Sequence, residues 1–190
     1  MGRQERLNTL NKKWVRDCTC TLRESATQAV LGNGSANAKI LFIGEAPGKK
    51  EDAEGIPFIG AAGKFLNELL LSIRLHREDV YITNTVKYRP PENRDPLPEE
   101  IAACREWLMR EIEIVDPLII VTLGRHALSH FLPNEKISEI HGKIFQKEIT
   151  ALGKRNLLPL YHPAAALYNG GLRATLIKDF KKIPRLLRTI

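Results

Sequence analysis

Short apolar runs alternate along this chain with longer stretches in which apolar residues recur at helical spacing. Runs of the length of a buried strand occupy residues 39–44, 80–84, 118–123 and 156–161. Helices are predicted between and after them, over residues 61–73, 98–115, 124–132 and 172–187. This alternation favours parallel strands with helices on both faces. We therefore expect an α/β fold: one three-layer α/β/α domain over residues 1–190, with a central, mostly parallel sheet of four strands.

Polar residues and a glycine turn follow three of these predicted strands. Asn84 ends the second strand and His162 follows the fourth, while Gly44, Glu45 and Ala46 leave the first. In open sheets of parallel strands, ligands bind beyond the carboxyl ends of the strands. We expect a functional site there, although a glycine turn is also an ordinary connection between two elements.

The charge of the chain is unevenly distributed. It carries 29 Lys and Arg against 22 Asp and Glu, a formal net charge of +7. Residues 151–190 account for all of this excess, so the first 150 residues are neutral overall. A basic carboxyl-terminal quarter suits a surface that meets phosphates, with Lys181 and Lys182 as candidate contacts. A solvated helix face explains the same charge equally well.

Composition excludes several other classes of protein. No apolar run reaches the roughly 18 residues that cross a bilayer, and the first residues lack the apolar centre of a secretory signal. The three cysteines do not make a disulfide framework. No Walker phosphate loop and no G-x-G-x-x-G occurs, which disfavours a nucleotide hydrolase and a dinucleotide site. We expect a cytoplasmic monomer that makes no membrane contact.

Three motifs follow one another along the chain. They are GEAPGKKEDAEGIPFIGAAG at residues 44–63, TNTVKYRPPENR at 83–94 and YHPAA at 161–165. The set resembles the uracil-DNA glycosylase superfamily, and most of all its fourth family, known chiefly from thermophilic bacteria and archaea. The resemblance runs from about Cys20 to Tyr168. It implies an enzyme that hydrolyses the N-glycosidic bond of deoxyuridine in DNA, releases free uracil and leaves an abasic site for base-excision repair.

The matched motifs suggest how the base is held and released. Phe58 would stack on the flipped base, although it could instead be a core residue. The Asn84 amide offers one donor and one acceptor, which complement uracil and mismatch cytosine. His162, if it is not a plain surface histidine, would stabilise charge on the departing uracil. Backbone amides around Glu45 and Ala46, next to Gly44, would do the same.

The group that acts on water is less determined by the sequence. The best-known branch of the superfamily carries an aspartate where this chain has Ala46, and the fourth family shares that lack. Glu45 and Glu51 are therefore both candidates. Glu51 could instead exclude the 5-methyl group of thymine. A carboxylate can also stabilise the sugar cation without accepting a proton.

DNA contacts are predicted mainly after His162. The resemblance implies that a side chain from this loop fills the gap left by the flipped base, and Leu167 and Tyr168 occupy the corresponding positions. Lys87 and Arg89 in the second motif are further candidates, and the basic terminal helix would follow the phosphates.

Members of the fourth family hold a four-iron four-sulfur cluster on four cysteines, and this chain departs from that pattern. Cys20 and Cys104 match the second and fourth ligand positions, whereas the first and third fall on Asp17 and Tyr88. Cys18 is close to the first position but has the wrong spacing. Because a cluster generally needs four protein ligands, we expect no metal and no cofactor. A three-cysteine site with an external ligand is the alternative.

Two other functions remain open within the superfamily. One is a glycosylase of broader base specificity, acting on hypoxanthine or mispaired thymine. The other is a non-catalytic relative that binds DNA or uracil. Retention of Phe58, Asn84 and His162 together argues against the second, because binding alone does not need all three.

Overall fold

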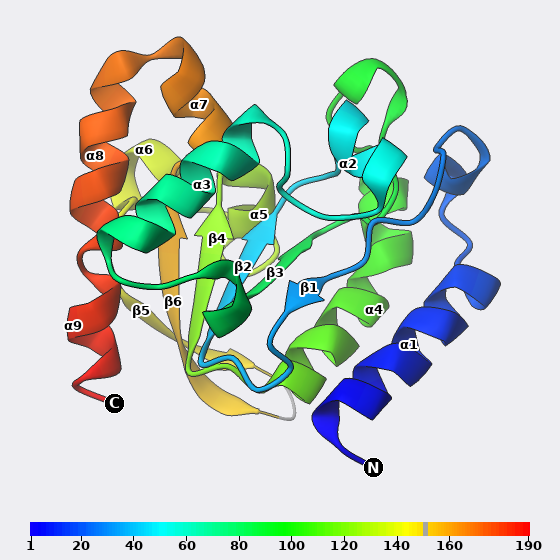
Figure 1. Ribbon diagram of the computed structural model, residues 1–190, viewed down its shortest axis with the longest axis horizontal. Coiled ribbons are helices and arrows are strands. Elements are labelled where there is room, and N and C mark those ends of the chain that lie inside the picture. Colours follow the sequence, from blue (N-terminus) through cyan, green and yellow to red (C-terminus); the bar gives the residue numbers. More distant parts are fainter. Residues whose placement is uncertain (150–151) are drawn as a thin grey trace.

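A central sheet covered by helices on both faces organises the protein in this computed structural model, which describes residues 1–149 and 152–190 (Figure 1). The order of the strands in the sheet is β1-β3-β2-β4-β6-β5. Their bounds are β1 Asn33–Gly34, β2 Ile40–Gly44, β3 Tyr81–Asn84, β4 Ile119–Leu123, β5 Phe145–Ile149 and β6 Gly153–Leu160. The predicted three-layer α/β fold is confirmed.

Six strands form the sheet in the described parts of the chain, so the prediction of four was two short. The predicted strands β3, β2, β4 and β6 pair in parallel and form the centre. The two additional strands lie at the edges, where β1 is antiparallel to β3 and β5 is antiparallel to β6. Neither contains an apolar run: β1 is a single Asn-Gly pair and β5 reads FQKEI. Backbone hydrogen bonds to the neighbouring strands hold β1 and β5 in the sheet. An apolar run in the sequence indicates only buried strands, so it does not predict these two edge strands.

Helices cover the sheet in two groups. Their bounds are α1 Arg3–Asp17, α2 Lys49–Glu54, α3 Ala61–Ser72, α4 Pro98–Val115, α5 Arg125–Ser129, α6 Ile137–Ile140, α7 Pro163–Tyr168, α8 Gly170–Phe180 and α9 Ile183–Leu187. Alternate residues of β2 separate the two cores, because successive side chains of a strand point to opposite faces. Phe42 packs with α3, α8 and α9, whereas Leu41 packs with α1 and α4. In the part of the chain that the structure describes, no helix is long and apolar enough to cross a membrane.

The predicted terminal helix over residues 172–187 is divided into α8 and α9. Pro184 occupies the second position of α9. Proline is tolerated in the first turn of a helix but removes a hydrogen bond from the interior. A new helix therefore starts beside Pro184, and α8 ends at Phe180.

Candidate active site

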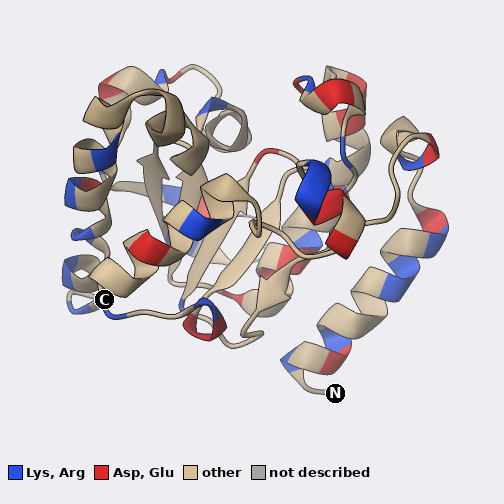
Figure 2. Cartoon of the chain, turned by 45° about the horizontal axis from the view of Figure 1, so that its top comes forward, with Lys and Arg blue, Asp and Glu red and all other residues tan. Residues whose placement is uncertain are grey.

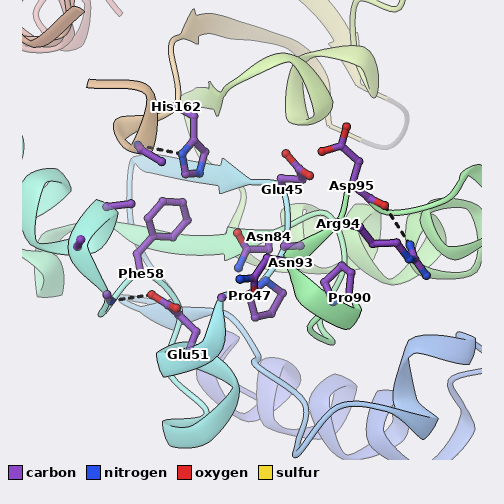
Figure 3. Close-up of a pocket in the computed structure, with 16 residues that line it drawn as sticks. Glu45, Pro47, Glu51, Phe58, Asn84, Pro90, Asn93, Arg94, Asp95 and His162 are labelled. Atoms are coloured by element: carbon purple, nitrogen blue, oxygen red, sulfur yellow. Dashed lines mark hydrogen bonds between the residues drawn. The ribbon is translucent and has the colours of Figure 1, made fainter. Parts of the chain in front are cut away.

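A cavity of about 360 Å³ opens at the carboxyl edge of the parallel strands (Figure 3). The loops that follow β2, β3 and β6 all contribute to it, as expected for an open parallel sheet. The predicted residues that line it are Glu45, Ala46, Glu51, Phe58, Asn84 and His162. Residues 44–63, 83–94 and 161–165 thus meet at one site, although 118 positions separate Gly44 from His162 in the sequence.

Asn84 lies at the bottom of the cavity with an unused hydrogen-bonding group. Only 1% of the residue is exposed, and its Oδ1 atom has no partner among the described residues. A buried polar atom left unpaired costs about 1–3 kcal/mol. Gly44, which pairs with Asn84 across β2 and β3, stands behind the cavity wall. A Cβ atom there would lie 2.4 Å from Asn84 Oδ1 and 2.5 Å from Phe58 Cζ, so only glycine leaves room for both.

Lys87 supports Asn84 from behind, and its burial disfavours the predicted contact with DNA. Only 4% of Lys87 is exposed. Its ammonium lies 2.6 Å from Glu111 Oε2 and donates to the Asn84 carbonyl oxygen at 2.9 Å. Glu111 also accepts hydrogen bonds from the hydroxyl groups of Tyr81 and Thr83, at 2.8 and 2.9 Å. A buried charge needs such a partner, and the sequence could not show that Glu111 of α4 supplies it.

Phe58 is held in an unusual backbone conformation beside the cavity. Its φ of 54° lies in the left-handed region, which a bulky residue rarely adopts. The Arg77 guanidinium fixes this turn by donating to the carbonyl oxygens of Phe58 and Pro57, at 2.8 and 2.6 Å. The ring then faces His162, with centroids 5.5 Å apart and planes 30° apart. Phe58 therefore offers one side of a slot suited to a flat ligand.

Glu51 fixes the same loop from the other side. Its Oε1 atom accepts hydrogen bonds from the backbone N–H groups of Ile59 and Gly60, at 2.9 and 2.7 Å. The carboxylate lines the cavity (Figure 3), but one of its two oxygens is occupied by these amides. Its position therefore explains the shape of the Phe58 loop.

His162 enters the cavity as a neutral hydrogen-bond donor. Burial lowers its pKa to about 4, so the ring is uncharged at neutral pH. The Nδ1 atom accepts a hydrogen bond from the backbone N–H of Ala164 at 3.1 Å. A neutral imidazole carries its proton on the other nitrogen, which makes Nε2 the donor.

Glu45 stands at the rim with charged neighbours. Burial and the nearby charge of Asp95 raise its pKa to about 7. Its Oε2 atom is 3.7 Å from His126 Nε2, and that nitrogen is 3.2 Å from Asp95 Oδ2. Neither Asp95 nor His126 was predicted from the sequence. Because His126 follows Gly124 at the carboxyl end of β4, the rule that pointed to Asn84 and His162 would also have pointed to it.

Comparison with known proteins agrees with this geometry. A profile of the Uracil DNA glycosylase superfamily matches residues 31–186, which include every residue found around the cavity. The chain belongs to the uracil-DNA glycosylase superfamily.

Curated relatives place it among the type-4 members of that superfamily. It is 48% identical to the type-4 uracil-DNA glycosylase of Archaeoglobus fulgidus over 88% of this chain and 86% of the relative. It is likewise 48% identical to the type-4 uracil-DNA glycosylase of Saccharolobus solfataricus, over 91% of this chain and 83% of the relative. The type-4 uracil-DNA glycosylase of Thermotoga maritima is 41% identical over 99% of this chain and 98% of its own length.

The predicted DNA-contacting residues of this uracil-DNA glycosylase superfamily member differ in exposure. At the end of α7, Leu167 and Tyr168 are exposed, the latter by 92%. Arg89 is half-buried and donates to Asn93, which lines the cavity, at 2.8 Å. These residues stay candidates for contacts near the flipped base.

The basic residues at the carboxyl-terminal end of α8 and in α9 lie away from the cavity. Figure 2 shows Lys and Arg along α8 and α9, and α8 runs from α7 toward the opposite edge of the sheet (Figure 1). Its 11 residues span about 16 Å. Lys181 follows its end, and Lys182 is held by Asp179 at 2.7 Å and by the Gly142 carbonyl oxygen at 2.8 Å.

Two exposed lysines that were not predicted from the sequence follow a residue of the cavity wall. Lys49 and Lys50 open α2, directly after Gly48 of the cavity wall. Their place in the first motif, KK after the glycine turn, was the available signal. They are better placed than Lys181 and Lys182 to meet phosphates beside a base in the cavity.

The cysteines form a buried group, but their donor set does not fit the cluster that the superfamily resemblance implies. Cys18 is turned inward beside Cys20 and Cys104, whereas Asp17 is exposed and pairs with Arg16. Hydrogen bonds from Cys104 and Cys20 lower the pKa of the Cys18 thiol. Cys18 thus joins the two cysteines that match the ligand positions, which is the arrangement that the three-cysteine alternative requires. A cubane still lacks its fourth thiolate.

The third ligand position, which falls on Tyr88, is filled by aromatic packing. Tyr88 is buried, and its ring stacks on Trp14 with centroids 6.1 Å apart, while Trp107 meets Trp14 edge-on at 5.3 Å. Burial and the nearby thiol of Cys18 raise the pKa of the Tyr88 phenol. A phenol that keeps its proton is a poor ligand for iron, so Tyr88 does not complete the site.

Proposed function

We propose that this protein is a uracil-DNA glycosylase that hydrolyses the N-glycosidic bond of deoxyuridine in DNA, releasing uracil and leaving an abasic site. The observation that carries the proposal is the unpaired Asn84 Oδ1 atom at the bottom of a cavity closed by Phe58 and His162. An amide with a free acceptor, set beside an aromatic face, matches the edge and face of a pyrimidine. The names of the type-4 relatives agree with it.

Base recognition would use the side and the bottom of the cavity. An extruded base costs a few kcal/mol of unstacking, and stacking on the Phe58 ring offsets part of it. The Asn84 amide would donate to uracil O4 and accept from N3–H. Cytosine presents the opposite pattern at both positions, so it would leave two buried groups unpaired at about 1–3 kcal/mol each.

In bond cleavage, the protein would stabilise both the negative charge that develops on uracil and the positive charge that develops on the sugar. As the C1′–N1 bond breaks, its electron pair moves onto the uracil ring, and Nε2–H of His162 would donate to O2. The sugar becomes cationic, water then adds its oxygen to C1′, and the proton that this water loses neutralises the uracil anion. A carboxylate beside C1′ stabilises that cation and orients the water.

We assign the role of that carboxylate to Glu45. Of the two candidates, Glu51 already binds two backbone amides of the Phe58 loop through Oε1. Glu45 stands on the opposite side of the cavity from Glu51 and has no backbone partner for its carboxylate among the described residues (Figure 3). Glu51 would act indirectly, because its carboxylate holds the loop that carries Phe58. The narrow slot that results would exclude the 5-methyl group of thymine.

DNA would be held by the loops around the cavity, by one chain acting as a monomer. Leu167 or Tyr168 would enter the gap that the base leaves, because both side chains are exposed at the end of α7. Lys49 and Lys50 would meet the flanking phosphates. We further propose that no iron-sulfur cluster takes part, since Tyr88 stands at one of its ligand positions.

The direct test is chemical. A duplex oligonucleotide with one deoxyuridine, labelled in the base, is incubated with the protein, and free base is measured by chromatography while alkali reveals the abasic site. We expect release of uracil and one alkali-labile site in equal amounts. Tight binding of the oligonucleotide without release of uracil would contradict the proposal and identify a non-catalytic relative.

A further inference from the structure

A group of charged residues at the rim of the cavity has no role in the mechanism so far. The side chains of Glu45 and Asp95 come from the loops after β2 and β3, and that of His126 from α5, which follows β4; their nearest polar atoms lie within 4.8 Å of one another. Arg125 joins them, because its Nη2 is 2.7 Å from Asp95 Oδ2 and its Nε is 2.9 Å from His126 Nε2. Three separate segments of the chain thereby meet around Glu45.

We propose that Asp95 and His126 are positioning residues, which set the place and the protonation of the Glu45 carboxyl group beside the sugar. This inference rests on the proposed glycosylase function, since it concerns how that reaction depends on Glu45. The proposed mechanism gives neither residue a contact with the base. Asp95 lies between Glu45 and Arg125, and His126 lies between Glu45 and Asp95, so both act through Glu45.

The hydrogen bonds identify which group holds a proton. Arg125 Nε donates to His126 Nε2, so that nitrogen carries no proton and the ring is neutral. Burial also lowers the pKa of His126, with Arg125 acting in the same direction. Partial burial opposes ionisation of Asp95, but the hydrogen bond from Arg125 and its positive charge lower the pKa of Asp95 overall. Asp95 is therefore the ionised member of the carboxyl pair near neutral pH.

Of the two carboxyl groups, Glu45 and Asp95, it is therefore Glu45 that is protonated first as the pH falls. The groups that face it are Asp95 from the loop before α4, and Arg125 and His126 from α5. Burial and then Asp95 raise its pKa to about 7, and Arg125 only partly opposes them. A protonated carboxyl cannot stabilise a cation. The excision rate should thus be low below pH 7 and should rise as Glu45 ionises.

The pH dependence of single-turnover excision tests this directly. In the natural protein, the rate should fall about tenfold for each pH unit below about 7 and level off above it. Asp95→Asn removes the like charge and leaves Arg125 free to face Glu45. The midpoint should then move to lower pH by about 1 unit or more. His126→Ala should lower the plateau rate while DNA affinity stays the same.

Two further variants keep the test decisive. Glu45→Gln should excise uracil slowly, and its rate should not fall further below pH 7; that fall is called the acid limb. This variant tests the inference even if Asp95→Asn folds poorly. Glu139→Gln, an exposed acid on α6, is the matched control and should leave the profile unchanged. Chelation of divalent cations should also change nothing. Loss of activity with chelator would instead assign Glu45, Asp95 and His126 to a metal ion.

The outcomes separate this inference from the proposed function. Absence of uracil release from the natural protein at every pH would contradict the function itself. Normal release with the same midpoint in the natural protein and in Asp95→Asn would overturn only the inference. Persistence of the acid limb in Glu45→Gln would also overturn it, because the limb would then belong to another group.

Discussion

The Nδ1 atom of His162 accepts the backbone N–H of Ala164 at 3.1 Å, and this one contact fixes the tautomer of the ring. The proton must then be on Nε2. Because burial lowers the pKa of His162 to about 4, the ring stays neutral across the physiological range. His162 therefore meets the developing uracil anion as a neutral donor that is already in place before the bond breaks.

Removing this donor should slow chemistry without weakening binding. We expect His162→Ala to lower the single-turnover rate by about 10²–10³, the usual loss for one charge-stabilising donor. Its affinity for uracil-containing DNA should change little. His76→Ala, an exposed histidine before β3, is the matched control. A His162→Ala protein with a near-normal rate would show that this histidine takes no part in the reaction.

The buried pair of Lys87 and Glu111 makes a prediction about stability. Lys87→Met leaves the Glu111 carboxylate buried without its partner, which should lower the free energy of unfolding by about 3–5 kcal/mol. Adding Glu111→Gln removes the orphaned charge and should restore much of that loss. Urea unfolding measures both. Equal stability of the single and double variants would contradict the pairing.

Two pairs of lysines give opposite predictions for the salt dependence of DNA binding. Reversing Lys49 and Lys50 to Glu should flatten the slope of log affinity against log salt by about 0.9 for each phosphate that is no longer neutralised. The decrease in affinity should be the same for every DNA sequence. Reversing Lys181 and Lys182 should have a smaller effect, because they follow the far end of α8. The opposite ranking would mean that DNA follows the terminal helices.

These charges mark a limit of what the sequence predicts. The central strands, α4 and the meeting of three motifs followed from apolar periodicity and from the rule that parallel sheets bind ligands at their carboxyl ends. Net charge along the chain, however, does not tell which face a lysine occupies. Lys87 stands in a motif beside Asn84, yet its side chain points into the core. It does so because its ammonium group forms an ion pair with Glu111, 24 positions later.

The group around Glu45 was missed for a related reason. Asp95 and His126 form no motif together, and only the fold brings their loops to Glu45. Cys18 shows the same limit on a local scale. Spacing assigned Asp17 to the ligand position, but the chain leaves α1 in an extended conformation at Cys18 and turns the thiol inward.

Iron content tests the account of the cysteines. The protein purified anaerobically should be colourless and hold no stoichiometric iron, because Tyr88 leaves Cys18, Cys20 and Cys104 one thiolate short of a cubane. A variant with Cys20→Ser and Cys104→Ser should stay folded and active. Tyr88→Ala should lower the stability by about 3–5 kcal/mol through loss of packing on Trp14, whereas Tyr88→Phe should keep it. A brown preparation with about four irons per chain would overturn this ligand count.

Base selectivity is the most direct test of the central claim, that the Asn84 amide reads a flipped uracil. Matched duplexes carrying uracil, cytosine or thymine at one position are incubated with the protein and treated with alkali, and strand scission is compared in single turnover. Uracil should be excised and the other two bases left essentially untouched, because cytosine reverses both groups that Asn84 contacts and thymine adds a methyl group. Asn84→Ala should lose most of the uracil activity. Comparable scission at cytosine by the natural protein would contradict the account.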